Sequence, residues 1–392
     1  MSRKQHQLSR RSFFNLAAAG GIGAALSSLI PGKGFAREPQ EQVKPSTNIQ
    51  DAMAYGRTAE SMPGKYPGKV VQVVHENCVV NNEPDQAAAY EMLRRGMLEL
   101  SGAETLSEAW LQFVTPSDKI GLKVNPVAGK VLTTSHQLVR AVISQLGEAG
   151  IPMDHIVIWD RREFELHETG FTQENYPGIV ITGTEQQDAS GSFYGPDGLL
   201  YGEKMIDKDW YYWADVEEEY DAYTLPYMVN SGKYSYFSKI CTQQVDKIIN
   251  IPILKNAGAS VTLCLKNLAY GCISNTGRLH KDLWSETCAQ VCAFPPVRDK
   301  VVLNIADGIR GCFNGGPGAN PQFITEFKTL LLGSDPVAVD RIGYEIVLKK
   351  RIAEGIQTED KPKARDFMNM AQELGLGIAD LDRIDVAVVN LT

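Results

Sequence analysis

The residues with the clearest chemical potential are lysines and asparagines at the ends of apolar segments. Lys123 and Asn125 end "KIGLKVN", and Lys255 and Asn256 directly follow "KIINIPIL". Two lysines that converge at strand ends suit a carboxylate or a phosphate, and a lysine with a lowered pKa can act as a base. The alternative is a pair of surface lysines beside ordinary turns.

Lys266 and Asn267 lie within the apolar stretch "VTLCLKNLAYG". A lysine among such neighbours needs a partner, because an unpaired buried charge is costly. We expect Asp307, Asp335 or Asp340 to supply it, or else the lysine stem extends its charge to water.

His280 opens the segment "HKDLWSETCAQVC", in which His280, Trp284, Cys288 and Cys292 are spaced four apart. On one helix they form a slowly drifting stripe. His280 is a candidate metal ligand, proton shuttle or substrate contact. It lies roughly 12 Å along such a helix from Cys288, too far to share one ion with it.

The cysteines predict either a metal centre or small core residues. Cys288 and Cys292 can offer two ligands to one metal, with Cys264 and Cys272 as the nearest additional candidates in the chain. No Cys-x-x-Cys occurs, so no zinc or iron–sulfur signature is recognisable. The clustering of cysteines still allows a metal ion or an iron–sulfur cluster, which we expect as a possible cofactor. The identity of the cofactor stays unknown.

Two further segments carry candidate polar groups. "DGIRGCFNGGPGANP", which contains Asp307 and Gly316, can cradle an anion with its backbone amides or serve as a plain connecting loop. Asp335 stands before Pro336 and is expected to cap a helix, with Asp340 on roughly the same side one turn later.

The first 36 residues predict an export signal. Arg10 and Arg11 precede Phe13, a weakly apolar run follows, and a small-residue cleavage site ends at Ala36. This pattern is typical of a twin-arginine signal, and its apolar run of about 15 residues is too short to span a bilayer. We expect a periplasmic or otherwise exported protein that meets the twin-arginine translocase, with no stable membrane anchor.

Composition narrows the choice of partners. The signal holds five Lys or Arg and no acid, so the mature chain has 34 basic and 47 acidic residues, a net charge of −13. Such a chain is not expected to bind nucleic acid or anionic membranes. A small anionic molecule is the expected ligand of the lysines.

The order of elements predicts an α/β fold, a mostly parallel sheet flanked by helices in two lobes with a cleft. A linker or strap (37–68) precedes an α/β lobe (69–185), an aromatic, acidic and β-rich excursion (186–238), and a second α/β lobe (239–392). The expected strands are 69–76, 119–125, 155–160, 178–183, 247–254, 300–309, 327–334 and 384–391. The expected helices are 85–102, 135–150, near 258–269, 280–292, 335–352 and 364–375.

Four blocks together resemble the family called domain of unknown function 362 (DUF362). They are "GLKVNPVAGKVLTTSHQLVRAVISQLGEAG", "INIPILKNAGASVTLCLKNLAYG…RLH", "NIADGIRGCFNGGPGANP" and "LLLGSDPVAVDRIGYEI", within roughly 118–391. The family looks distantly similar to the two-lobed lactate racemases, and some relatives carry a ferredoxin-like cysteine cluster. This chain lacks a Cys-x-x-Cys-x-x-Cys run, and Ala257 stands where the family often has a histidine.

We therefore expect an exported cofactor- or metal-dependent enzyme, with redox chemistry, that acts on a small anionic substrate. His280, Lys266 and Lys255 are the catalytic candidates. The substrate-binding candidates are Lys123, Asn125, Asn267, Asp307 and Gly316. One alternative is a metal-free isomerase or lyase that uses His280 and a lysine as acid and base. Another is a binding protein for a small anion or a glycan, with the excursion's aromatic residues as its surface.

Overall fold

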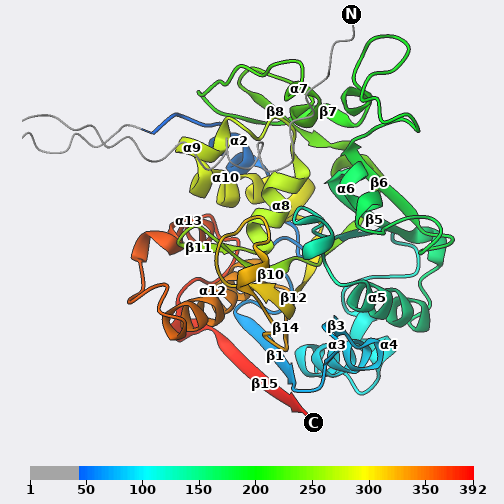
Figure 1. Cartoon of the computed structure of the whole chain (residues 1–392), viewed down its shortest axis with the longest axis vertical. Helices are drawn as coiled ribbons and strands as arrows, with labels where there is room; N and C mark the ends of the chain where they lie inside the picture. The colour runs from blue at the N-terminus through cyan, green and yellow to red at the C-terminus, as the bar shows by residue number, and fades with distance from the viewer. Residues whose placement is uncertain (1–43) are drawn as a thin grey trace, which may run out of the picture. The chain divides into compact units, whose positions relative to one another are not determined.

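The computed structural model describes residues 44–392, and Pro45–Thr392 form one compact unit (Figure 1). The predicted signal, residues 1–36, lies outside the described residues, as does the start of the predicted linker. Among the helices of the described chain, none combines the length and the apolar character needed to cross a membrane.

The unit is built around an eleven-stranded mixed sheet. Its main path runs β15 (Asp385–Leu391), β1 (Lys69–His75), β14 (Thr329–Gly333), β12 (Val301–Cys312), β9 (Lys247–Asn250), β4 (Ile120–Lys123), β5 (Ile156–Arg162) and β6 (Val180–Glu185). The neighbours from β12 to β6 are all parallel, as are β1 and β15, whereas β14 is antiparallel to both β1 and β12. The predicted mostly parallel α/β fold is confirmed.

Shorter strands complete the structure. β10 (Ile253–Ala257) pairs parallel with β12, while β11 (Ser260–Thr262) and β13 (Ile324–Thr325) are antiparallel neighbours of β10 and β12. β2 (Val79–Val80) and β3 (Glu83–Pro84) form a small separate hairpin.

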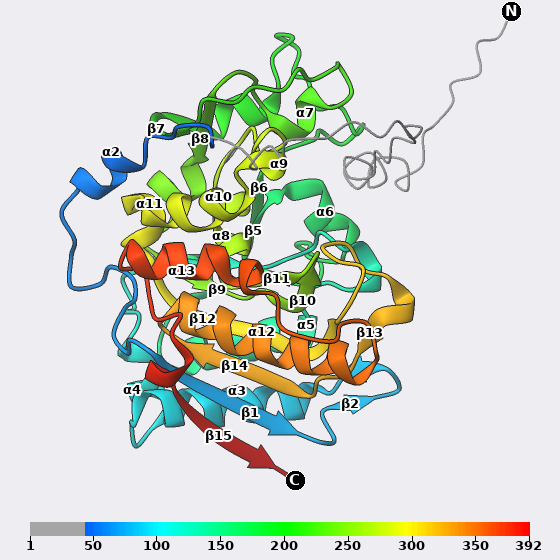
Figure 2. The ribbon, with the colours of Figure 1, turned by 90° about the vertical axis from the view of Figure 1, so that its left-hand side faces the viewer.

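Helices cover both faces of the sheet, because alternate strand residues point to opposite sides. Val157 and Trp159 of β5 pack with α8 (Cys264–Cys272), α10 (Trp284–Gln290), α12 (Pro336–Ala353) and α13 (Asp366–Glu373). Ile156 and Ile158 pack with α3 (Gln86–Ser101), α4 (Leu106–Leu111) and α5 (His136–Glu148) on the other face. Figure 2 shows α12 and α13 in front of the strands and α3 behind them. The remaining helices are short: α2 (Ile49–Ala54), α6 (Glu163–Glu168), α7 (Leu225–Met228), α9 (Leu279–Asp282) and α11 (Pro295–Arg298).

Two separate lobes are not confirmed. β1, from the first predicted lobe, pairs with β14 and β15 from the second, and β4 pairs with β9. Strands from both halves are neighbours in one sheet, so backbone hydrogen bonds join the two halves directly.

The predicted helix over 280–292 is wrong, because the chain breaks it at Leu283. α9 ends at Asp282, α10 starts at Trp284, and Cys292 falls in a short 3₁₀ turn, Val291–Ala293. Pro252 likewise divides the predicted strand 247–254 into β9 and β10, since proline has no N–H for a ladder bond. The segment near 258–269 begins with β11 before α8 starts.

Residues 186–238 leave the main sheet and contribute a two-stranded ribbon of β7 (Ile206–Trp213) and β8 (Tyr234–Ser238). Its aromatic residues pack on one another: the Tyr211 and Tyr234 rings lie 5.1 Å apart, and Phe193 meets Tyr227 at the same distance. This packing favours a structural cover over a glycan-binding surface.

Candidate functional site

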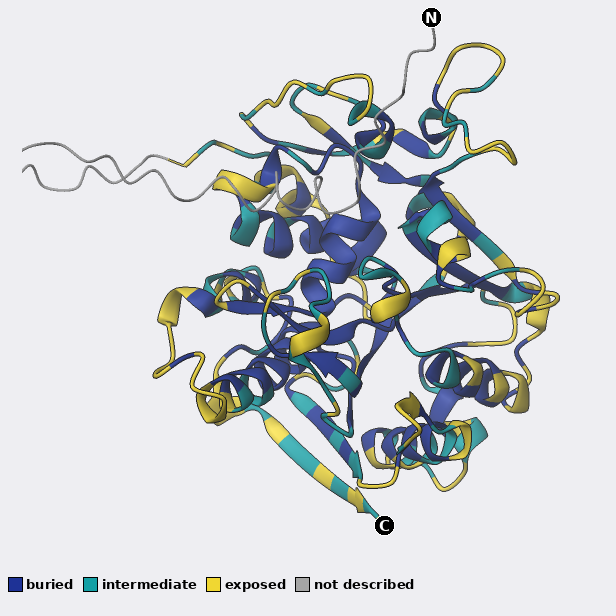
Figure 3. Cartoon of the chain, viewed as in Figure 1, coloured by how far each residue is buried: buried dark blue, intermediate teal, exposed yellow. Residues whose placement is uncertain are grey.

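The candidate site lies where β4, β5, β6 and β9 reach their carboxyl ends. After β4 the chain adds β5 and β6 on one side, and later β9 on the other side of β4. Lys123, the last residue of β4, pairs with Asn250, the last residue of β9. Ligands of open α/β sheets bind at such reversals of strand order. α8 packs over this edge and is buried along its whole length (Figure 3).

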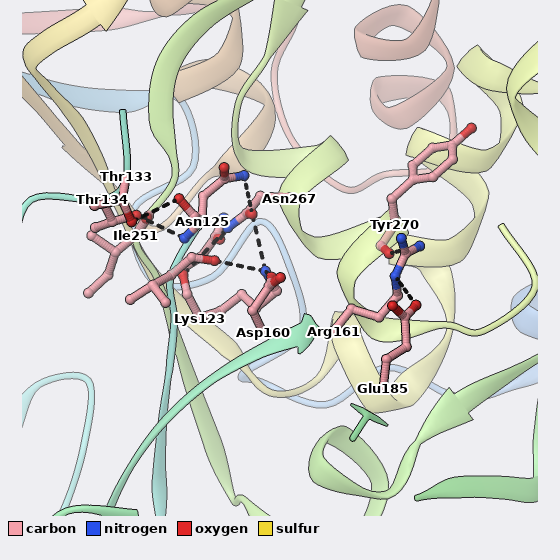
Figure 4. A network of polar contacts seen from close by, with 12 residues as sticks. Lys123, Asn125, Thr133, Thr134, Asp160, Arg161, Glu185, Ile251, Asn267 and Tyr270 are labelled. Atoms are coloured by element: carbon pink, nitrogen blue, oxygen red, sulfur yellow. Dashed lines mark hydrogen bonds and ion pairs between the residues drawn. The ribbon is translucent and has the colours of Figure 1, made fainter. Parts of the chain in front are cut away.

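Lys123 forms a dry ion pair at this edge. Its Nζ is paired with Asp160 of β5, and it donates hydrogen bonds to Val124 O at 2.9 Å and Asn267 Oδ1 at 3.1 Å (Figure 4). Lys123 is 1% exposed and Asp160 is 3% exposed. A Cβ on Gly271 of α8 would lie 2.9 Å from Nζ, so the close approach of α8 depends on this glycine.

A chain of side-chain amides runs through the site. Lys255 Nζ donates to Asn125 Oδ1 at 2.9 Å, and Asn125 Nδ2 donates to Asn267 Oδ1 at 2.9 Å. Asn267 Nδ2 continues to Asn250 Oδ1 at 2.8 Å, and Asn250 Nδ2 continues to Asn304 Oδ1 at 2.9 Å. The ammonium of Lys123, which is paired with Asp160, can only donate, so Asn267 Oδ1 accepts from it. This fixes the orientation of the Asn267 amide and, through it, those of Asn125 and Asn250.

Lys255 differs from Lys123 in having no carboxylate within ion-pair distance among the described residues. It is 1% exposed. Burial first, and then the positive charge of Lys266, lower the pKa of Lys255 to about 8. A substantial fraction of its amine is therefore neutral under mildly alkaline conditions.

Lys266 projects from the first turn of α8 toward aromatic rings. Its Nζ lies 5.5 Å from the ring centroids of both Tyr270 and Trp284, which is cation–π distance. Its side chain is 8% exposed, and burial lowers its pKa.

The aspartates expected to pair with Lys266 are engaged elsewhere, so that prediction is wrong. Asp340 accepts from the backbone N–H of Cys264 at 2.5 Å and of Leu265 at 3.0 Å, at the start of α8. Asp335 caps α12 through Val337 N and Ala338 N, as predicted. Asp307 accepts from Ser135 N. Each carboxylate thus satisfies backbone donors that helix and strand ends leave open.

His280 presents an acceptor nitrogen that meets no hydrogen-bond donor in the part of the chain that the structure describes. Its Nδ1 lies 2.9 Å from Thr276 O; a carbonyl only accepts, so Nδ1 carries the proton and Nε2 the lone pair. The ring packs 4.5 Å from the Tyr270 ring, centroid to centroid. Desolvation first, and then the charges of Lys266 and Arg161, lower the pKa of His280 to about 3. The ring keeps exposed surface, so solvent screens part of this effect; the direction of the shift leaves His280 neutral at pH 7.

Arg161 connects the strand ends to the histidine segment. Its guanidinium is 2.8 Å from Glu185 Oε1 at the end of β6, and its Nη1 donates to Tyr270 O at 3.1 Å and to Thr276 Oγ1. Thr276 is also the residue that holds His280 through its carbonyl. Arg161 therefore fixes the backbone that sets the orientation of the His280 ring.

Two predicted substrate-binding residues lie apart from this group. Asp307 lines a separate pocket of about 110 Å³ with Ser135 and Arg310. Burial raises the pKa of Asp307. Gly316 donates its N–H to Asn256 Oδ1 at 2.8 Å, and its contact with the Asn256 carbonyl leaves no room for a side chain. Gly316 thus anchors the glycine-rich loop on β10.

The candidate metal ligands Cys264, Cys272, Cys288 and Cys292 are fully buried free thiols. Cys272 contacts Cys241, and Cys292 Sγ donates to Leu265 O at 3.6 Å. Burial raises the pKa of all four, which disfavours the thiolate that a metal needs. In the part of the chain that the structure describes, no three His, Cys, Asp or Glu side chains gather to hold a metal ion. The metal prediction finds no ligand set here and stays a prediction.

Sequence reasoning missed several residues of this group. Asp160 ends the predicted strand 155–160, so its position at a strand terminus was a usable signal. Arg161, directly after it, had the same signal. Asn250 gives no such signal, because the expected strand 247–254 runs past it and only the structure ends β9 there. Tyr270 gives no signal beyond the apolar character of its helix.

A family model matches part of the chain. Residues 216–345 match the model of DUF362, a domain of unknown function. The chain carries a DUF362 domain. The DUF362 segment contains Lys255, Lys266 and His280, whereas Lys123 and Asp160 precede it. No protein with a curated description matches the chain at a significant level.

Proposed function

We propose that this DUF362 protein is an isomerase or lyase that acts on a small anionic substrate by acid–base chemistry. The observation that carries the proposal is the pairing of two groups around Tyr270. The ring of the neutral His280, whose Nε2 meets no hydrogen-bond donor among the described residues, lies 4.5 Å from the Tyr270 ring, and the buried Lys266 Nζ lies 5.5 Å from the same ring.

The two groups suit complementary roles. A neutral imidazole can remove a proton from a carbon or an oxygen, and a buried lysine ammonium can bind the substrate's negative charge or return the proton. Lys123 is neutralised by Asp160, so Lys266 and Lys255 supply the positive charge left for an anion. Arg161 keeps its own charge compensated by Glu185.

Proton exchange tests this proposal. The purified protein would be incubated in D₂O with a panel of small 2-oxo and 2-hydroxy acids, and deuterium incorporation at carbon followed by NMR. We expect incorporation or cleavage for at least one acid, and its loss in His280→Gln. His167→Gln, an exposed histidine on α6, is the matched control and should leave exchange intact. Exchange that is unchanged in His280→Gln would refute the role of His280.

The metal-dependent redox alternative makes the opposite prediction for the cysteines. The acid–base proposal expects Cys288→Ala to retain exchange, whereas a metal enzyme needs its ligands. Metal and sulfide analysis of protein purified without oxygen, with a visible spectrum, decides between them. Stoichiometric iron with sulfide would refute the acid–base proposal and support the redox enzyme.

We also propose that the protein is exported through the twin-arginine translocase. The support is the Arg10–Arg11 pair, the weakly apolar run and the small-residue site at Ala36. The test is the N-terminus of the protein recovered from the periplasm, which should begin at Arg37. Lys substitution of both Arg10 and Arg11 should leave the protein unprocessed; unchanged export of that variant would refute this route.

A further inference from the structure

A small pocket, separate from the lysine and histidine groups, holds a buried carboxylate. The pocket has a volume of about 110 Å³, and Asp307 of β12 lines it together with the start of α5 and the loop before that helix. Asp307 is 2% exposed. Its Oδ2 accepts from Ser135 N at 2.8 Å and its Oδ1 from Ile309 N at 3.2 Å, but it forms no ion pair with a lysine or an arginine in the described chain. Its negative charge is therefore left for a ligand to compensate.

The start of α5 brings backbone donors to the same pocket. Ser135 is the N-cap residue of this 13-residue helix, but its side chain makes no capping hydrogen bond. The first N–H groups of a helix have no partner within the helix. Those of His136 and Gln137, two residues that line the pocket, also meet no acceptor elsewhere among residues 44–392. Such donors, at the positive end of the helix dipole, suit a negatively charged group.

Two basic side chains in the lining add positive charge. Arg310 and Lys130 both line the pocket. The Arg310 side chain is 23% exposed, and its Nη1 lies 3.8 Å from Oε1 of the exposed Glu83, which is beyond hydrogen-bond distance. The guanidinium of Arg310 therefore keeps N–H groups that can bind the carboxylate of a ligand.

The pocket thus combines a carboxylate that suits a cation with donors that suit an anion. Its volume corresponds to about four water molecules at roughly 30 Å³ each, so a ligand of about six non-hydrogen atoms fills it. The wall is held in place by the fully buried Thr134, whose Oγ1 accepts from Asn125 N at 2.8 Å and donates to Ile251 O at 2.9 Å. A pocket with fixed walls is typical of small-molecule sites.

We propose that this pocket binds a small α-amino acid. The ammonium group of the ligand contacts Asp307, and its carboxylate contacts the first N–H groups of α5 and the Arg310 guanidinium. Glycine and alanine have the required size, whereas an amino acid with a large side chain exceeds the volume. The site goes beyond the proposed function, because none of the residues that line it belongs to the group around Tyr270.

Isothermal titration calorimetry with the full chain tests the proposal. Glycine and L-alanine should bind at one site per chain with a dissociation constant below about 1 mM. Acetate lacks the ammonium group and methylamine lacks the carboxylate, so each should bind at least roughly 10-fold more weakly. No saturable binding of either amino acid would overturn the inference. Acetate or methylamine binding as tightly as glycine would overturn it too, as would L-phenylalanine binding as tightly as alanine.

Variants locate the bound amino acid. Asp307→Asn and Arg310→Gln should each weaken glycine binding by about 10- to 100-fold, because each removes one charged contact. Arg95→Gln, on the exposed side of α3, is the matched control and should bind as the parent does. Urea unfolding shows whether each variant is folded; Arg310→Gln leaves the backbone contacts of Asp307 in place. Glycine binding in Arg310→Gln as tight as in Arg95→Gln would contradict the assignment. His280→Gln should keep glycine binding even where proton exchange is lost, and loss of binding in that variant would instead place the amino acid at His280.

Discussion

Removing the carboxylate of Asp160 should destabilise the fold strongly. In Asp160→Ala the Lys123 ammonium, 1% exposed, keeps its hydrogen bonds to Val124 O and Asn267 Oδ1 but loses the one carboxylate that pairs with it among the described residues. Removing one partner of a buried ion pair costs about 3–5 kcal/mol. Asp160→Asn keeps an acceptor oxygen and nearly the same volume, so its cost should be lower, about 2 kcal/mol.

The assay is equilibrium unfolding in urea, read as the midpoint and slope for each variant. The matched control is Glu60→Ala, which removes an exposed carboxylate paired with the partly buried Lys247 and should cost no more than about 1 kcal/mol, because Glu60 itself faces solvent. A double variant, Lys123→Met with Asp160→Leu, should recover most of the loss because no charge then stays buried.

Equal losses of unfolding free energy in Asp160→Ala and Glu60→Ala would refute the reasoning. If Asp160→Ala costs no more than Glu60→Ala, water reaches Lys123 in solution, and the edge of the sheet is not a dry site. A double variant as unstable as Asp160→Ala would show that packing, and not the unpaired charge, caused the loss.

Three further outcomes are expected. Gly271→Ala should destabilise the fold by about 1–3 kcal/mol and reduce proton exchange, because the new Cβ would press on Lys123. In the control Gly147→Ala, on the exposed face of α5, the new Cβ meets no atom and the change should be neutral or stabilising. Equal effects of the two changes in urea unfolding would contradict this. The pKa of Lys255 is lowered to about 8 in the folded protein, so wild-type stability relative to Lys255→Met should rise between pH 8 and 10.5, by up to about 3 kcal/mol; a flat difference would rule out the lowered pKa. The lowered pKa of His280 predicts that its ring resonance, assigned by its loss in His280→Gln, does not titrate by NMR between about pH 5 and about pH 8; a midpoint in that window would refute a neutral base.

Much of the fold could be predicted because its signals are local. The alternating apolar runs of β1, β4, β5 and β15 predict strands, and the apolar period of α3 and α12 predicts helices with Gly102 and Asp335 at their ends. Strand–helix alternation predicts a parallel sheet, and Lys123 and Lys255 after apolar strands predict polar groups at its carboxyl edge.

Only the three-dimensional arrangement decided which partner and which charge environment each of those polar groups has. Which lysine has a carboxylate depends on the pairing of β4 with β5, which brings Asp160 to Lys123 and leaves Lys255 facing an amide. The break at Leu283 turns His280 toward Tyr270 and away from the cysteines that share its apparent periodicity. Sequence by itself determined which residue types stand at which element ends, because backbone propensity and burial period act over a few neighbours. Charge state and partner choice came only from the tertiary structure, because desolvation and ion pairing depend on atoms brought together from distant parts of the chain.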